Sequence, residues 1–307
     1  MSTKDSKKGR ETMYNPQLET FIRVADAGSF NKAAEQAFIT PTAVLKQINL
    51  LEADLGVQLF DRTHRGLSLT KAGNSLYKDT KYIIQYCKDS VIRAKNAMQE
   101  TADMIRIGTS PMTPAQVLVE LWPKIHTLCP ETKFKLVPFE NTPENAREIL
   151  KNLGQNIDVV AGIFDETMLN LRQCAGFELF RQPLCCAVSI HHRLADKKTL
   201  TIQDLYEENL LLMHRGWSHY VDRLRDDIWQ NHSQIHIVDF DFYSVDVFNR
   251  CENGNDVLMA VQVWDNVHPL LKVIPVEWDH SIPYGLLHSS EPSAAVKRFL
   301  SAIQKVL

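Results

Sequence analysis

Residues 18–73 have the sequence LETFIRVADAGSFNKAAEQAFITPTAVLKQINLLEADLGVQLFDRTHRGLSLTKAG. The apolar residues at its start recur at helical spacing and so share one side of a helix: Leu18, Phe21, Ile22 and Ala25. We expect Gly28 to end this helix in the left-handed conformation. Ser29 is expected to cap a second short helix whose inward residues are Phe30, Ala33, Ala34 and Ala37.

A third helix is predicted to start at Thr40, because the hydroxyl can cap the first turn and Pro41 lacks an N–H that this turn does not need. Its apolar side consists of Val44, Ile48, Leu51 and Leu55, and its polar side of Thr42, Lys46, Asn49 and Ala53, with Leu45 between them. A helix with one face in the core and one free face is what a helix-turn-helix presents to the major groove of DNA.

Residues 59–70 predict two short strands around a basic tip, as in a wing that follows a helix-turn-helix. The alternative is a small helical packing module with a loop. The wing is favoured because the signals at Ser29, Thr40–Pro41, Gly56 and the basic tip all agree.

The candidate DNA contacts divide into residues that position the protein and residues that read bases. Lys32 beside Ser29, together with Arg62 and Thr70, is suited to phosphates, and Arg65 at the wing tip is suited to the minor groove. The face of the third helix would meet the major groove. The complete set is Ser29, Lys32, Thr40, Thr42, Leu45, Lys46, Asn49, Arg62, Arg65 and Thr70. Alternatively, Lys32, Lys46 and Asn49 are plain surface residues, Leu45 is an exposed apolar residue, and Arg62 forms a structural ion pair with a helix carboxylate.

The composition is that of an ordinary globular protein of about two domains, since 44% of the 307 residues are hydrophobic and 23% are charged. The apolar runs are far shorter than the roughly 20 residues of a membrane span, and the polar start lacks the apolar core of a signal peptide. We therefore expect a cytoplasmic protein with no membrane partner. The six cysteines have no C-x-x-C spacing, which favours reduced and mostly buried thiols.

Charge is distributed unevenly along the chain. Residues 1–100 carry 15 Lys and Arg against 11 Asp and Glu, whereas the formal charge of the whole chain is -3. Only the first third is therefore suited to a polyanion. Residues 1–13 are expected to be a disordered basic tail.

Residues 73–102 are predicted to form one long helix. Tyr77, Ile84, Val91 and Met98 recur every seven residues, which is the period of a coiled coil. Such a stripe is either a dimer seam or ordinary core.

Beyond residue 102 the pattern changes to alternating strands and helices. Strands are expected at 104–109, 133–138 and 157–163, with helices at 115–128 and 142–153 between them, which predicts a parallel sheet. A second unit has strands at 183–190, 210–213 and 234–240 and helices at 217–229 and 243–252. Strands at 273–276 and 284–288 and a terminal helix at 293–306 complete the domain, residues 103–307.

Polar residues follow two of the predicted strands, where helix starts leave free N–H groups that bind small anions. An anionic effector is therefore one interpretation. The candidate effector contacts are Thr109, Ser110, Phe164, Asp165, His214, Arg215, Ser218, Tyr243 and Ser244. In the alternative, Thr109 and Ser110 only cap the helix, and Arg215 is a surface residue.

The sequence disfavours two other classes of protein. An enzyme that uses the cleft of residues 103–307 is disfavoured, because no H-E-x-x-H, G-x-S-x-G or glycine-rich phosphate loop accompanies His191–His192, His214, His219 or Cys185–Cys186. We expect no catalytic residues, metal or cofactor. A solute-binding protein is contradicted by the first 100 residues.

The stretch quoted above resembles the winged helix-turn-helix of LysR-type transcriptional regulators through Gly28-Ser29-Phe30, Ala33-Ala34, Gln47-Ile48, Leu51-Glu52, Leu55-Gly56, Leu59-Phe60, Arg62 and Leu69-Thr70-x-Ala72-Gly73. The resemblance implies an α plus α/β fold: the winged domain at 14–72, a linker helix at 73–102 that pairs two subunits, and a two-lobed domain at 103–307 like a periplasmic binding protein. It implies a homodimer or homotetramer that binds double-stranded operator DNA and a small-molecule effector between the lobes. Thr40-Pro41-Thr42 and Leu45 depart from the family pattern where bases are read.

Overall fold

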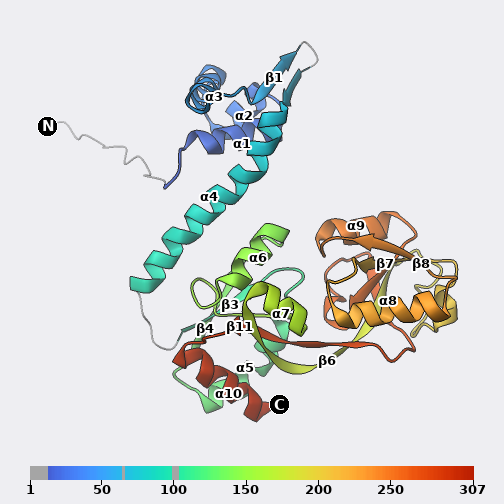
Figure 1. Cartoon of the computed structure of the whole chain (residues 1–307). Helices are drawn as coiled ribbons and strands as arrows, with labels where there is room; N and C mark the ends of the chain where they lie inside the picture. The colour runs from blue at the N-terminus through green and yellow to red at the C-terminus, as the bar shows by residue number, and fades with distance from the viewer. Residues whose placement is uncertain (1–12, 64–65, 99–103) are drawn as a thin grey trace. The chain divides into compact units, whose positions relative to one another are not determined.

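The structure is a computed structural model that describes residues 13–63, 66–98 and 104–307. The chain divides after Met98 into two compact units. The first unit contains α1 (Gln17–Ala27), α2 (Phe30–Ala37), α3 (Pro41–Leu55), β1 (Phe60–Thr63), β2 (Gly66–Leu69) and α4 (Lys71–Met98), as Figure 1 shows.

The helix ends of the first unit follow the cap signals of the sequence. Gly28 and Gly56 have positive φ angles of 60° and 68°, and the Thr40 hydroxyl accepts a hydrogen bond from the Ala43 N–H at 3.2 Å. Ser29 occupies the cap position of α2, but its side chain makes no cap hydrogen bond. The predicted helix starts and stops are thus confirmed, and only the hydroxyl contact expected of Ser29 is wrong.

One apolar core holds α1, α2, α3 and the wing together. Its buried members are Phe21, Val24, Ala33, Ala34, Val44, Ile48, Leu51, Leu59 and Phe60. Leu55 was expected on this apolar side but is 46% exposed. It is the last residue of α3, immediately before the Gly56 cap, where the chain turns away from the core.

The wing is an antiparallel pair in which Phe60 lies opposite Leu69. Glu52 of α3 fixes the entry to the wing, because its Oε1 accepts hydrogen bonds from the Leu59 N–H at 2.7 Å and the Phe60 N–H at 3.2 Å. Gly73, in the first turn of α4, lies so close that a Cβ there would be 2.1 Å from the Leu59 carbonyl oxygen. The wing therefore packs on α4 without room for a side chain at Gly73.

The second unit is built on one sheet. Within the described residues its strand order is β4-β3-β5-β11-β6-β9-β7-β8, and β10 pairs with β6. The first lobe contains β3 (Met104–Thr109), α5 (Gln116–Leu128), β4 (Lys133–Pro138), α6 (Pro143–Lys151), β5 (Val159–Ile163), α7 (Glu166–Arg172) and the terminal α10 (Ala294–Val306).

The second lobe contains the 3-10 helix η1 (Ile202–Leu205), β7 (Asn209–Met213), α8 (His219–Asn231), β8 (His236–Phe240), α9 (Val245–Asn253), β9 (Val257–Val261), η2 (Gln262–Trp264) and β10 (Leu271–Pro275). Two strands connect the lobes: β6 (Cys174–Ser189) and β11 (Ser281–Ser289). β11 pairs with β5 of the first lobe, whereas the second half of β6 pairs with β9 and β10. Figure 1 shows these two strands running side by side between the lobes.

β3 and β4 lie at the bounds that the sequence predicted, but two elements were not predicted. These are α7 and β9, and β6 is also much longer than the predicted strand at 183–190. β9, with sequence VLMAV, is fully buried and only five residues long, and periodicity alone cannot assign such a short apolar run to a strand or a helix.

Candidate DNA-binding surface and effector cleft

The outer face of α3 is not used by the core of the first unit. Thr42, Lys46 and Asn49 are exposed, and Leu45 is half-buried at the edge of this face. Lys32 of α2 is also exposed. An exposed helix face of this length, with one cation and short polar side chains, has the shape and chemistry that fit the major groove of DNA.

Arg62 makes the structural contacts that were the alternative to phosphate binding. Its Nη2 donates to Asn49 Oδ1 at 2.7 Å and lies 3.5 Å from Glu52 Oε2, and its guanidinium lies 5.2 Å from the centre of the Phe30 ring. Arg62 therefore ties β1 to α3 and α2. These contacts also engage Asn49, one of the predicted base-reading residues.

The other predicted DNA contacts have local roles in the fold. The Thr70 hydroxyl donates to the Gln58 carbonyl oxygen at 2.8 Å and accepts from the Gly73 N–H at 2.9 Å, so it caps α4 and holds the wing. Thr40 caps α3, as described above. Arg65 and the basic tail up to residue 12 lie outside the described residues.

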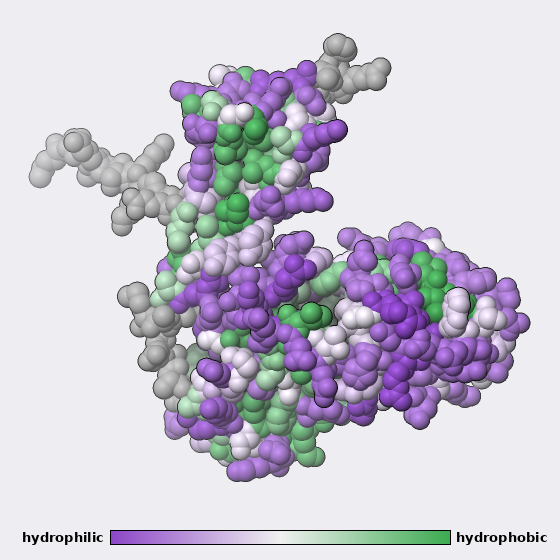
Figure 2. All heavy atoms as spheres, in the orientation of Figure 1, coloured by the Kyte–Doolittle hydropathy of each residue, from purple (hydrophilic) through white to green (hydrophobic). Residues whose placement is uncertain are grey.

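The predicted seam on α4 is partly covered by the same chain. Tyr77 packs edge-on against Phe21, 6.5 Å between ring centres, and its hydroxyl donates to Asp26. Ile84 is buried within one chain, whereas Val91 is only partly buried. Met98 is the last residue of α4. A different face of α4 carries exposed apolar residues: Tyr82, Ile83 and Tyr86. Figure 2 shows apolar atoms on the surface of the first unit between hydrophilic side chains.

In the first lobe, the predicted effector residues lie in turns after β3 and β5. The Ser110 Oγ is 2.8 Å from the Thr113 Oγ1, and Thr109 ends β3. Because α5 begins only at Gln116, neither residue caps that helix. Phe164 is buried. Asp165 caps α7, where its Oδ1 accepts from the Met168 N–H at 2.8 Å.

In the second lobe, Arg215 and Tyr243 are already engaged. Arg215 is exposed and donates to Asp226 Oδ1 at 2.5 Å, and this hydrogen bond raises the pKa of Arg215. The Tyr243 hydroxyl donates to the Met259 carbonyl oxygen at 2.8 Å, and burial raises its pKa well above the ordinary value. Ser218 and Ser244 occupy the cap positions of α8 and α9, and His214 is exposed beside Arg215.

The two lobes touch through residues that the sequence analysis only partly identified. Asp165 Oδ2 accepts from the His219 N–H at 2.9 Å, and the Asn141 side chain donates to the Tyr243 carbonyl oxygen at 2.7 Å. Trp217 packs against apolar residues of both lobes. Asp165 and Tyr243 were predicted to face the cleft. Asn141 was missed because nothing in its local sequence marks a partner 102 residues away.

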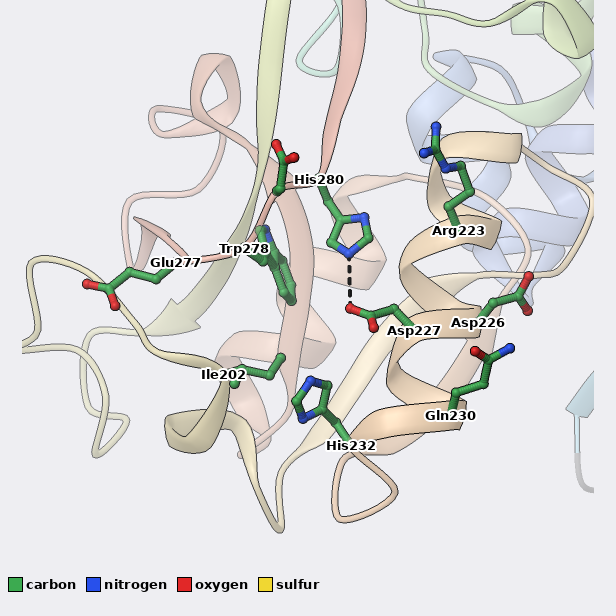
Figure 3. Close-up of a pocket in the computed structure, with 10 residues that line it drawn as sticks. Ile202, Arg223, Asp226, Asp227, Gln230, His232, Glu277, Trp278 and His280 are labelled. Carbon is green, nitrogen blue, oxygen red and sulfur yellow. Dashed lines mark hydrogen bonds and ion pairs between the residues drawn. The ribbon is translucent and has the colours of Figure 1, made fainter.

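A separate pocket of about 580 Å³ lies in the second lobe between α8, η1 and the turn before β11 (Figure 3). His280 Nε2 lies 3.2 Å from Asp227 Oδ2 across it, and Trp278 and His232 form further walls. Hydrogen bonds from Asn231 and His280 lower the pKa of Asp227. None of the predicted effector residues lines this pocket. In the sequence, the Trp-Asp-His run at 278–280 is a feature that could have indicated it.

The histidines and cysteines that could suggest a metal site or a thiol nucleophile have other surroundings in the described part of the chain. No cluster of three His, Cys, Asp or Glu there could hold a metal ion. Burial raises the pKa of Cys185 to about 11 and raises that of Cys186 well above its ordinary value, so neither thiol favours the thiolate form that a nucleophile requires. His192 is buried, and its Nδ1 accepts from the Leu194 N–H at 3.2 Å. Of the helices described, none is long and apolar enough to cross a membrane.

Two family models match the chain. The model of bacterial regulatory helix-turn-helix proteins of the lysR family matches residues 16–74, and the model of the LysR substrate binding domain matches residues 98–307. The crystal structure of CbnR, a LysR family transcriptional regulator, superimposes with a TM-score of 0.55 at 20% identity and covers 94% of this chain and 98% of its own. This likeness establishes the fold.

Curated relatives are regulators as well. The nitrogen assimilation regulatory protein nac of Klebsiella aerogenes is 28% identical over 50% of this chain and 52% of its own length. The Hca operon transcriptional activator HcaR of Escherichia coli is 28% identical over 61% of each chain. The chain thus spans about half the length of the curated relatives it matches. Since the two family models together match most of its residues, the chain belongs to the LysR family of bacterial helix-turn-helix regulatory proteins.

Proposed function

We propose that this chain is a cytoplasmic DNA-binding transcriptional regulator whose activity is controlled by a small-molecule effector. The observation that carries the proposal is the free outer face of α3, with Thr42 and Lys46 exposed beside a wing. Ser29, Lys32 and Thr40 lie at helix starts and are suited to hold the phosphate backbone. Leu45 cannot hydrogen-bond a base edge but can pack on a thymine methyl group.

The DNA-binding half of the proposal is tested by a mobility shift. The full chain is titrated into labelled DNA from upstream of its own gene, with an excess of unrelated DNA as competitor, at two salt concentrations. We expect a complex that survives the competitor and weakens as salt rises, because phosphate contacts release counterions. A complex that unrelated DNA removes at equal concentration would contradict specific binding.

We propose that the chain assembles as a homodimer or homotetramer through α4. The structure favours Tyr82, Ile83 and Tyr86 as the seam, because Tyr77 and Ile84 already pack within one chain. A symmetric pair of α4 helices would also give the assembly two α3 helices, as a protein that binds two half-sites of DNA requires.

Tyr86→Asp is expected to split the assembly, since a carboxylate would be desolvated in the seam, and to weaken self-association by at least about tenfold. Ile84→Asp is expected to lower the stability of the first unit instead. Light scattering and urea unfolding measure the two effects, with Lys88→Asp as a charge control elsewhere on α4. If Tyr86→Asp remains fully assembled, the seam lies elsewhere.

The effector half of the proposal rests on linkage. A ligand that binds one arrangement of the lobes more tightly than another shifts the equilibrium between the two arrangements. We propose that this shift changes the spacing and angle of the paired α3 helices. The contacts between Asp165 and His219 and between Asn141 and Tyr243 are those that such a shift would make or break. The proposed effector contacts remain Thr109, Ser110, Phe164, Asp165, His214, Arg215, Ser218, Tyr243 and Ser244.

Ser110→Ala and Arg215→Ala are expected to differ in their effect on the effector response. Ser110 is buried in the turn after β3, so losing its hydroxyl should weaken an effector bound there about tenfold. Arg215→Ala should weaken only an anionic effector, since Asp226 otherwise holds the guanidinium. DNA titrations with and without candidate metabolites measure both. Wild-type responses in both variants would place the effector elsewhere.

A further inference from the structure

On the strands that connect the lobes, two buried side chains each have one polar atom that makes no hydrogen bond to any described residue. These atoms are the Gln182 Oε1 on β6 and the Tyr284 hydroxyl on β11. The residues are only 7% and 1% exposed. A buried polar atom without a partner costs free energy, and a molecule bound from outside the chain would supply the missing hydrogen bond.

The strand register places the two side chains on the same face. Gln182 lies opposite Ile282, and Phe180 lies opposite Tyr284. Because paired residues and residues two positions apart share a face, these four side chains form one surface. Gln182 and Tyr284 are diagonal neighbours on it, and the register shift begins only beyond Tyr284. Diagonal neighbours are about 7 to 8 Å apart, so one small molecule can span the two side chains.

The surroundings of this face are apolar. Tyr284 packs in the first-lobe core with Leu118 of α5 and stacks on Phe180 at 5.3 Å between ring centres. Ile282 packs in the second-lobe core. Arg181 lies on the opposite face, where it donates to Ser281 Oγ at 3.0 Å and covers the Tyr220 ring. The four residues of this surface thus carry no charge that could neutralise a buried anion.

The chemistry of the two atoms restricts what binds. Gln182 Oε1 accepts a hydrogen bond and so requires an N–H or O–H from the ligand. Burial raises the pKa of Tyr284 to about 12, so its hydroxyl keeps its proton and can donate to a ligand oxygen. A carboxamide offers both groups side by side, whereas a carboxylate offers only acceptors, cannot donate to Gln182 Oε1 and would bury an unpaired charge.

We propose that the face of β6 and β11 formed by Phe180, Gln182, Ile282 and Tyr284 binds a small neutral molecule with an apolar body and a carboxamide. Its N–H donates to Gln182 and its carbonyl accepts from Tyr284. Since β6 and β11 join the lobes, a ligand on them is positioned to alter the arrangement of the lobes. This last step rests on the proposed effector control of DNA binding, whereas the binding itself does not.

The binding test uses benzamide as the probe and benzoate as its anionic counterpart, with the full chain in equilibrium dialysis and no DNA present. Benzamide should bind at least about tenfold more tightly than benzoate, because benzoate would bury an uncompensated charge. Tyr284→Phe and Gln182→Leu should each weaken benzamide binding by about tenfold. Acetamide and isobutyramide, with smaller apolar bodies, should bind more weakly than benzamide.

Urea unfolding without any probe provides the matched control. Tyr284→Phe removes a hydroxyl without a partner and should leave the unfolding equilibrium constant unchanged or lower. Tyr243→Phe removes a buried hydroxyl that donates to the Met259 carbonyl oxygen and should raise that constant about fivefold.

The proposal is overturned if none of the three amides binds, if benzoate binds as well as benzamide, or if Tyr284→Phe binds benzamide like the wild type. It is also overturned if Tyr284→Phe destabilises the chain as much as Tyr243→Phe, since the hydroxyl would then have a partner within the protein. A mobility shift with benzamide then tests control of DNA binding separately. Benzamide that binds the chain but leaves DNA affinity unchanged would contradict the regulatory step and retain the site.

Discussion

Gly73→Ala is expected to destabilise the first unit by about 3 kcal/mol, at the upper end of what overpacking costs. The added Cβ would lie 2.1 Å from the Leu59 carbonyl oxygen and 3.0 Å from Leu69 Cδ2, so backbone rather than a flexible side chain would have to move. The same movement would pull the wing from the Thr70 cap of α4. Urea unfolding followed by circular dichroism measures the loss.

Ser75→Ala is the matched control for Gly73→Ala, because Ser75 is exposed two residues further along α4. Its effect should stay within about 0.5 kcal/mol. If Gly73→Ala also stayed within that range, the wing would not pack on α4 as closely as described.

Lys46→Ala is expected to weaken specific DNA binding by about ten- to a hundredfold while leaving the unfolding midpoint unchanged. Lys46 is exposed on the free face of α3 and is not a member of the buried core. A lost cation at the DNA costs about 1 to 3 kcal/mol if it reads a base, and reduces the salt dependence by about one unit if it contacts a phosphate. Mobility shifts at several salt concentrations measure both quantities.

Lys88→Ala removes the same charge from α4 and serves as the control, since its exposed side chain lies outside the winged domain. We expect it to bind DNA like the wild type. Equal losses in Lys46→Ala and Lys88→Ala would mean that general charge, and not the face of α3, governs the affinity.

The first unit was largely predictable because its signals are local. Glycine caps, the Thr40–Pro41 start and the apolar spacing of Val44, Ile48 and Leu51 act within a few residues, and the structure follows each of them. The prediction that Leu55 lies in the core was wrong, because helical spacing does not show where the core ends. The Glu52 contacts to the wing also had no local signal, since they join residues seven and eight positions apart by backbone N–H groups.

The second unit was less predictable because its order depends on distant pairings. The full length of β6 follows from its pairing with β11, about 100 residues later, and not from a pattern within β6. The predicted cleft residues show the same limit. Asp165 was identified, but no local pattern pairs it with His219, whose backbone N–H and Nδ1 both lie near Asp165 Oδ2. Gln182 and Tyr284 become noticeable only when a structure shows that two of their polar atoms lack partners.

A nuclease footprint of the full chain on DNA upstream of its own gene tests the central claim most directly. If α3 of each subunit enters a major groove, protection should appear as two half-sites centred about one helical turn of DNA, or a multiple of it, apart. The Lys46→Ala variant should lose protection at both half-sites at the same protein concentration. Protection that is absent, or that spreads evenly along the fragment and is unaffected by Lys46→Ala, would contradict recognition of DNA by the exposed face of α3.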